Sequence, residues 1–306
     1  MSLVINHNMM AMNASRNLSH SYGALATSTR RLSSGLRVGI AADDAAGLAI
    51  RELMRADIAS FNQGVRNAND AISMIQTADG ALQVVDEKLI RMKELAQQAA
   101  TGTYTSDQRL IIDSEYQAMA SEITRIAMAT DFNGVHLLNG NLSATTPDPT
   151  SWAATHNGKG IQPTGPIKIH FGAGNDSAED YYYIAIGNST ASALGVGNNS
   201  DPASAGHDIS TQHNAQRALD AINEAIISKD KIRASLGALQ NRLQNTVTNL
   251  QIQAENLQAS ESRISDVDVA TEMTEFVRNQ IKSQAAVAML SQANSLPQMA
   301  MQLING

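Results

Sequence analysis

The stretch "LSSGLRVGIAADDAAGLAI", residues 32–50, interrupts a helical pattern with three glycines and a pair of aspartates. Gly35 can adopt the left-handed conformation that ends a helix, and Gly39 then loosens the chain after it. Asp43 or Asp44 follows, where a carboxylate can accept hydrogen bonds from the free N–H groups of a new helix. The stretch therefore predicts a joint between two helices, with Gly35 and Gly39 as its hinge residues.

A second joint is predicted in "SRISDVDVATEM", residues 262–273, where Asp266 or Asp268 can start another helix. Each joint leads to an amphipathic terminal helix. The predicted assembly stripes on these helices include Leu18, Leu25 and Leu32 near the N-terminus and Met273, Val277, Ile281, Leu296 and Leu303 near the C-terminus. Pairing of the two helices covers part of this apolar surface, and the remainder predicts contacts with further copies of the chain.

Two long segments between the joints carry the seven-residue spacing of a coiled-coil seam. One row consists of Leu236, Leu243, Leu250, Leu257 and Ile264. The N-terminal half has two such rows, Phe61, Ala68, Ile75, Leu82, Leu89 and Ala96, and Ala78, Val85, Met92 and Ala99. A helix from Asp44 to Ala100 would be roughly 85 Å long. A further stripe, Leu110, Tyr116, Met119, Ile123 and Ile126, is predicted to fold back on this helix.

The middle of the chain differs from both arms. Five of the six prolines lie between Pro147 and Pro202, together with Trp152 and a run of three tyrosines at 181–183, which indicates turns and short strands. Before it, "DFNGVHLLNGN" (131–141) contains two Asn-Gly pairs, a strong hairpin signal.

These patterns predict a mainly α fold. We expect a long antiparallel helical coiled-coil bundle formed by both chain ends, with a short β-hairpin and a small β-rich central insert. The predicted domains are the terminal helices at 1–42 and 263–306, the long-helix bundle with its hairpin at 43–140 and 208–262, and a small surface-exposed insert at 141–207.

Composition excludes several classes of function. The formal net charge is −7 without any block of Lys or Arg, so neither nucleic acid nor an anionic membrane surface is an expected partner. The absence of cysteine removes disulfides and thiol catalysis. No apolar run approaches about 18 residues, which predicts no membrane insertion. The beginning, "MSLVINHNMM", lacks the regions of a cleaved signal peptide, so we expect a cytosolic protein or one exported without cleavage.

Three groups of residues could indicate a catalytic or metal-binding site, and each also has a simpler structural interpretation. Asp43 and Asp44 could be an acid pair, but adjacent carboxylates at a helix start are usually caps. His207 and His213, with Asp208 between them, have poor spacing for metal ligands. The methionines near both termini (Met9, Met10, Met12, Met299 and Met301) could bind copper, although flexible packing at a subunit interface is favoured. We therefore predict no catalytic, cofactor or metal site, and no enzyme.

Several long motifs resemble those of bacterial flagellins. They are "RLSSGLRVGIAADDAAGLAI" (31–50), "VRNANDAISMIQTADGAL" (65–82), "DFNGVHLL" (131–138), "LGALQNRL" (236–243), "SRISDVDVATEM" (262–273) and "AMLSQANSLPQ" (288–298). The resemblance covers both arms, whereas the insert has no recognisable likeness. It implies a subunit of the flagellar filament, whose terminal helices form the inner core and whose long-helix bundle forms the layer around it.

The same resemblance implies partners and a location. The chain would polymerise with itself, leave the cell through the flagellar export apparatus with an export chaperone, and meet hook-associated and cap proteins. It would be secreted and extracellular, as part of the bacterial flagellum. Residues Arg91, Leu95, Gln98 and Glu115 fall on positions that flagellins present to the vertebrate Toll-like flagellin receptor. The alternative for this face is contact with a neighbouring filament subunit.

A filament subunit has two alternatives. A hook-associated junction protein shares the terminal helices and would form a short ring instead of an indefinite fibre. An enzyme housed in the insert would need a constellation of polar groups that the insert does not show. We also expect residues 1–40 and 267–306 to be largely disordered in the monomer, because isolated amphipathic helices gain little from propensity alone.

Overall fold

The computed structural model describes residues 8–143, 165–177, 179–197 and 205–305, and within 296–305 only the side chain of Met299. The helices are α1 (Met9–Ser34), α2 (Ala45–Ala100), α3 (Ser106–Ala129), α5 (Ala191–Leu194), α6 (Gln212–Ser265) and α7 (Val269–Asn305). The strands are β1 (Asp131–Phe132), β2 (Val135–His136), β3 (Ile167–His170) and β4 (Tyr181–Ile184). The predicted mainly α fold is confirmed, and α2 has the predicted bounds within one residue.

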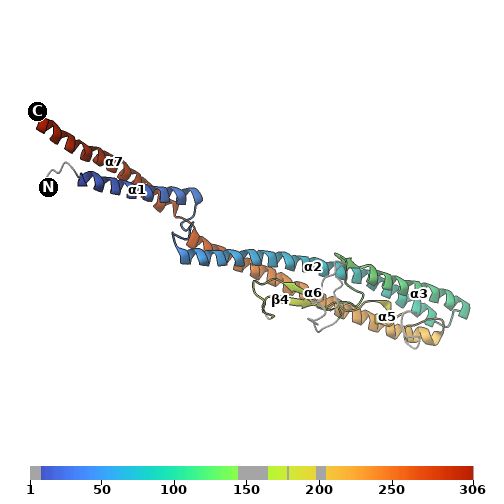
Figure 1. The fold of residues 1–306 in the computed structure, drawn as a ribbon. Coiled ribbons are helices and arrows are strands. Elements are labelled where there is room, and N and C mark those ends of the chain that lie inside the picture. The colour runs from blue at the N-terminus through green and yellow to red at the C-terminus, as the bar shows by residue number, and fades with distance from the viewer. Residues whose placement is uncertain (1–7, 144–164, 178, 198–204, 306) are drawn as a thin grey trace. The chain divides into compact units, whose positions relative to one another are not determined.

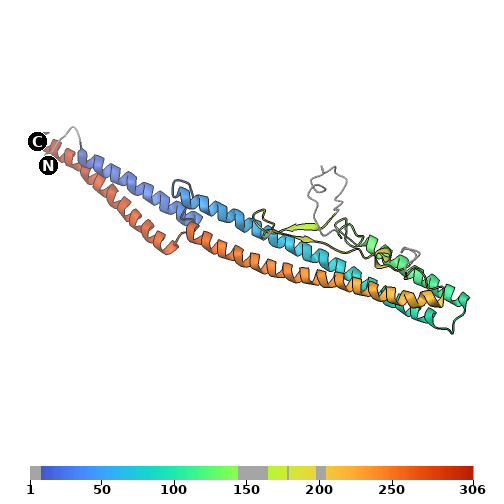
Figure 2. The ribbon, with the colours of Figure 1, turned by 90° about the horizontal axis from the view of Figure 1, so that it is seen from below.

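The chain divides into two compact units, residues 1–58 with 255–306 and residues 59–254. This boundary falls inside α2 and α6, whereas the domain boundaries predicted from the sequence lie at the joints. In the first unit, α1 and α7 lie side by side (Figure 1, Figure 2).

The second unit is built on the antiparallel pair α2 and α6, with α3 running alongside them (Figure 1, Figure 2). The predicted seven-residue rows lie in the interior, and all their members from Ala68 to Ala99 are buried. The α6 row is buried at Leu236, Leu243 and Leu250, and Leu257 and Ile264, which belong to the first unit, are half-buried. The coiled-coil pattern therefore identified the interior positions of both long helices.

The buried face of α3 differs from the predicted stripe at its N-terminal end. Leu110 is largely exposed, and Ile112 takes the interior position. Tyr116 and Ile123 are buried as expected. Counting back from Tyr116 by four residues gives Ile112, whereas a step of six residues to Leu110 leaves the helix face.

The first Asn-Gly pair forms the predicted hairpin. Asn133 has φ 52° and Gly134 has φ 79°, as a two-residue type I′ turn requires. The strands pair antiparallel, Asp131 with His136 and Phe132 with Val135. The N–H of Gly134 donates to Oδ2 of Asp131 at 3.0 Å, which closes the turn.

The central insert contains an antiparallel pair in which β3 and β4 align Ile167 with Ile184 and His170 with Tyr181. The expectation that the insert only lies on the surface is wrong for its described residues. Ile184 and Ile186 are fully buried against residues of α2 and α6, and Leu194 and Val196 belong to the core around Tyr116. The apolar residues of this segment therefore complete the interior of the bundle.

Candidate assembly surfaces

The first joint is closed at both helix ends by residues that the sequence singled out. Gly35 has φ 73°, and its N–H donates to the carbonyl of Arg31 at 2.8 Å, so it ends α1 as predicted. Asp44 caps α2, because its Oδ1 accepts from the N–H of Gly47 at 2.9 Å. Asp43 accepts instead from the Arg30 guanidinium at 2.7 Å. Gly39 does not have a positive φ, and its hinge role stays a prediction.

The second joint starts α7 in the same way. Oδ1 of Asp268 accepts from the N–H groups of Ala270 at 3.0 Å and Thr271 at 3.3 Å. Hydrogen bonds from the Thr271 side chain and from these N–H groups lower the pKa of Asp268 below its usual value. Of the two predicted start residues, Asp268 is therefore the cap, and Asp266 forms a β-bridge with Leu36.

Backbone hydrogen bonds tie the two joints to each other. The N–H of Arg37 donates to the carbonyl of Ser265 at 2.6 Å, and the N–H of Val267 donates to the carbonyl of Gly35 at 3.0 Å. The Arg37 guanidinium also donates to the carbonyl of Ile264 at 2.8 Å, where α6 ends. The chain segments that leave α1 and α6 are thus paired directly after the helix ends.

The residues of the predicted assembly stripes are buried to different extents on the two terminal helices. On α1, Leu18, Leu25 and Leu32 are half-buried. On α7, Met273, Val277 and Ile281 are 45%, 44% and 60% exposed. The more buried positions of α7 are instead Phe276, Asn279, Ser283, Ala286, Leu290 and Ala293. The side chains of Leu296 and Leu303 lie outside the described residues.

Three exposed residues of α7 therefore form an apolar ridge, which we define as Met273, Val277 and Ile281. Their spacing of four residues keeps them close to one helix face. Met9, Met12 and Tyr22 of α1 are more than half exposed as well. Within the described residues, the α1–α7 pair therefore leaves large apolar side chains of both helices uncovered.

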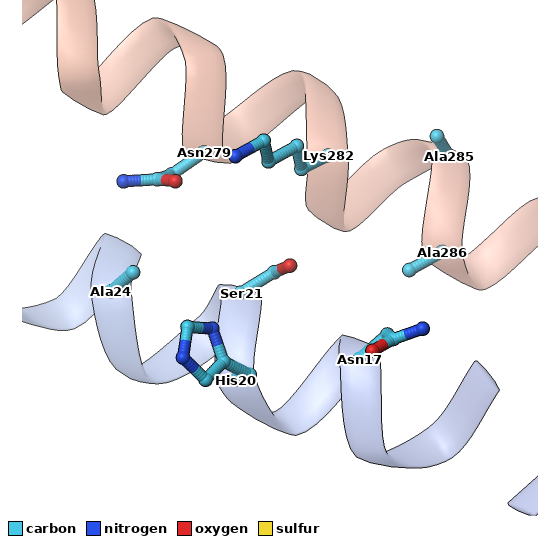
Figure 3. Close-up of a pocket in the computed structure, with 8 residues that line it drawn as sticks. All are labelled: Asn17, His20, Ser21, Ala24, Asn279, Lys282, Ala285 and Ala286. Carbon is cyan, nitrogen blue, oxygen red and sulfur yellow. The ribbon is translucent and has the colours of Figure 1, made fainter. Parts of the chain in front are cut away.

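A cavity of about 370 Å³ lies between α1 and α7 (Figure 3). Small and polar side chains line it from both helices, namely Asn17, His20, Ser21, Ala24, Asn279, Lys282, Ala285 and Ala286. Short side chains at these positions cannot fill the space between two helices. The helix pair is therefore loosely packed along this stretch.

The four residues of the predicted receptor patch have different environments. Arg91 and Glu115 are partly exposed and linked across α2 and α3, with Nη2 of Arg91 2.7 Å from Oε1 of Glu115. Gln98 is exposed and donates to the hydroxyl of Tyr104 at 3.1 Å. Leu95 is only 2% exposed and packs in the core around Tyr116. The expectation that Leu95 shares an exposed face with Arg91 is wrong, because the helix turns this position toward α3 and α6.

The other candidate residues do not converge. Oδ1 of Asp208 accepts from Nδ2 of Asn214 at 2.6 Å, so it is engaged in the loop before α6. Among the described residues, no three His, Cys, Asp or Glu side chains are grouped as metal ligands would be. No helix in the described part of the chain is both long and apolar enough to cross a bilayer.

Comparison with known proteins agrees with this architecture. The model of the bacterial flagellin N-terminal helical region matches residues 5–143, and that of the bacterial flagellin C-terminal helical region matches residues 219–304. The chain is 40% identical to the flagellar filament 33 kDa core protein of Treponema phagedenis over 302 residues, which are 99% of this chain and 100% of the relative. It is also 40% identical to flagellin of Bacillus subtilis over 306 residues, covering 98% of this chain and 99% of the relative.

A solved structure shares the fold at lower similarity. A protein described as a flagellar hook-associated protein from Vibrio parahaemolyticus has a TM-score of 0.53 and 14% identity, covering 73% of this chain and 100% of that one. Such a likeness supports the helical fold alone. The full-length matches, together with the two matched helical regions, show that this chain belongs to the bacterial flagellin family.

Proposed function

We propose that the chain is a structural subunit that self-assembles into the helical bacterial flagellar filament used for motility. The observation that carries this proposal is the apolar ridge of α7, Met273, Val277 and Ile281, which the intramolecular pairing with α1 leaves exposed. Exposed apolar faces of this length mark interaction sites. Membership of the flagellin family implies polymerisation, so other copies of the chain are the expected partners.

Negative-stain electron microscopy of the purified chain after seeded polymerisation tests this function. We expect long tubes. Short rings or persistent monomers would contradict it and favour the alternative, a hook-associated junction protein. The two relatives at 40% identity over nearly the whole chain are named as a flagellar filament core protein and as flagellin, which favours the filament subunit.

Replacement of the ridge residues gives a sharper test of the surface itself. Met273→Ser with Ile281→Ser removes apolar area that is already exposed, so the monomer should fold as before and polymerise less. The control is Ile252→Ser on α6, whose side chain is 51% exposed, between the values of Met273 and Ile281. Equal polymerisation of the ridge variant and the control would show that the ridge is not an assembly surface.

Secretion and the other partners belong to the same proposal, which the family membership supports. The proposed route is the flagellar export apparatus, with an export chaperone in the cell and hook-associated and cap proteins at the growing filament. No catalytic activity is proposed, since the flagellin family is structural. Detection of the chain in sheared filaments from intact cells, separated from a cytoplasmic marker protein, tests the extracellular location.

The partly exposed Arg91–Glu115 pair, with Gln98, is proposed as a surface read by the vertebrate Toll-like flagellin receptor. The hydrogen bonds that the Arg91 guanidinium donates to Glu115 and Glu94 raise its pKa further, so Arg91 stays charged. An arginine can form paired charged hydrogen bonds with a receptor carboxylate, and such residues often dominate an interface. The buried Leu95 would act only by holding α2 in place.

Arg91→Ala should therefore weaken receptor signalling by monomers about tenfold or more, the usual size of a hot-spot effect. The readout is a cell-based reporter assay with purified monomers. Lys93→Ala is the matched control, since Lys93 is an exposed cation two residues away on another side of α2. Equal signalling by the two folded variants would remove Arg91 from the proposed surface.

A further inference from the structure

One lysine lies inside the apolar seam of α6. The residues at seven-residue steps, Ile222, Lys229, Leu236, Leu243 and Leu250, are all buried. Lys229 is only 2% exposed, and lysine is almost never buried to this extent unless it is paired. Its Nζ contacts the carboxylate of Asp86 on α2 and, at 2.8 Å, that of the adjacent Asp230.

A second ion pair lies one helical turn away. Nε of Arg233 donates to Oδ1 of Asp79 on α2 at 2.7 Å. Asp79 and Asp86 are seven residues apart, so they occupy equivalent positions along α2. Together, Asp79, Asp86, Lys229 and Arg233 form a layer of charge between the two long helices, which we define as the charged layer.

The charged layer lies where two apolar cores meet. One core includes the α2 residues up to Leu82 and the α6 residues from Leu236 onward. The other core includes the buried α2 residues from Val85 onward and the buried α6 residues up to Ala225. On either side of the layer, the seams repeat every seven residues with interchangeable Leu, Ile, Ala and Val side chains.

Such regular seams do not define one alignment by themselves. Sliding α6 along α2 by seven residues places apolar side chains opposite apolar side chains again. In one direction the slide would bring Lys229 opposite Lys93 and create repulsion. In the other direction it would bring Arg233 opposite Ile72 and leave the guanidinium without its carboxylate. Only the observed alignment pairs both cations.

We propose that the charged layer selects the register of α2 and α6 when this flagellin folds. A single polar residue in an otherwise apolar seam is a known means of excluding alternative registers. The opposing charges on the two helices supply both the attraction in the observed register and the penalty in the others.

Distance measurements between two spin labels test this proposal. The chain has no cysteine, so Val84→Cys and Ile227→Cys place unique labels on exposed positions of α2 and α6 close to the charged layer. The labelled chain is refolded from denaturant and studied by pulsed electron paramagnetic resonance. The unmodified seam should give one distance.

The test variant carries Asp79→Asn, Asp86→Asn, Lys229→Leu and Arg233→Gln, which makes the α6 row fully apolar. We expect a second distance that differs by up to about 10 Å, the rise of seven helical residues. The control is Glu122→Gln with Arg125→Gln, which removes an ion pair within α3 and should leave one distance.

If the fourfold variant does not refold cooperatively, the same measurement is made with Asp86→Asn and Lys229→Leu alone. A single wild-type distance in the folded variant overturns the proposal. A merely stabilising role would change the denaturant midpoint without adding a second distance, so the two roles are distinguished.

Discussion

At the scale of single residues, the joint at 32–50 depends on backbone conformation more than on side-chain contacts. Gly35 ends α1 with φ 73°, whereas Gly39 lies a few residues later with no positive φ. A Cβ added to either glycine would meet no atom within 4 Å. The two positions therefore differ in conformation alone and form a matched pair.

Gly35→Ala should destabilise the chain by about 1 kcal/mol, because a residue with a Cβ is strained in the left-handed region. Gly39→Ala should be close to neutral or slightly stabilising. Urea unfolding followed by circular dichroism measures both. Equal effects of the two substitutions would mean that the left-handed conformation of Gly35 does not limit the joint.

Asp79 provides a test by pH. The hydrogen bond from Arg233 lowers the pKa of the Asp79 carboxyl below its usual value, despite an opposing effect of partial burial. Because the folded chain binds this proton more weakly than the unfolded chain, the pair stabilises the fold fully above the unfolded pKa of about 4. The contribution is lost as pH falls through the lower folded pKa.

Wild type should therefore be more stable than Asp79→Asn near pH 7, and the difference should shrink toward pH 2. Urea midpoints across this range measure the difference. The stability difference between wild type and Arg233→Gln should shrink in parallel, because this substitution removes the same ion pair. A difference that stays constant with pH would contradict the role of the ionised carboxylate.

At the scale of elements, the insert is held against the long helices by a close backbone approach. A Cβ on Gly64 of α2 would lie 2.0 Å from the backbone oxygen of Phe171, directly after β3. Nδ2 of Asn67 donates to the neighbouring carbonyl of His170 at 2.8 Å. The Arg242 guanidinium of α6 lies 3.5 Å from the ring centroid of Tyr182 on β4. The strand pair thus contacts both long helices.

Gly64→Ala should cost about 1–3 kcal/mol, since the added methyl must displace backbone. Gly80→Ala is the control on the same helix: its Cβ would meet nothing within 4 Å, and it should stabilise by about 0.5–1 kcal/mol. Thermal unfolding compares the two variants. A Gly64→Ala variant as stable as the control would show that the insert does not need this close approach.

The elements that the sequence predicted best are those governed by local rules. The seven-residue rows, the Gly35 end of α1 and the Asn133-Gly134 turn depend on residues close in sequence, so their patterns could be interpreted directly. The burial of Ile184 and Ile186 could not, because contacts more than a hundred residues away in sequence decide it. The same is true of Leu95, which the family pattern placed on a surface and the packing of α3 covers. The signal for the charged layer was present, as the one lysine in the α6 row, but its partner on α2 required the structure.

At the scale of the whole molecule, the two units are stabilised differently. Residues 59–254 contain two apolar cores with large buried side chains such as Tyr116, Leu82 and Met92. The α1–α7 pair has Ser28 and Ser283 among its buried residues and a cavity between the helices. Small polar contacts of this kind contribute little free energy, so we expect the terminal helices to become stably ordered only when further copies cover them.

Removal of residues 267–306 should therefore abolish filaments while the bundle of residues 44–140 and 208–262 still melts cooperatively. Hydrogen exchange of full-length monomer and filament should show protection of residues 8–40 and 267–305 in the filament alone. Strong protection of both ends in the free monomer, or tubes formed by the truncated chain, would overturn this expectation.

The paired joints have a mechanical consequence. Because the N–H of Arg37 bonds to Ser265 at the end of α6 and the carbonyl of Gly35 bonds to Val267 just after it, the two connections cannot pivot separately. A twist applied to one connection is transmitted to the other through these two backbone hydrogen bonds. When a rotating filament applies torque to a subunit, the two connections would then resist twisting together, as a crosslinked pair does, and would be stiffer than two connections that rotate independently.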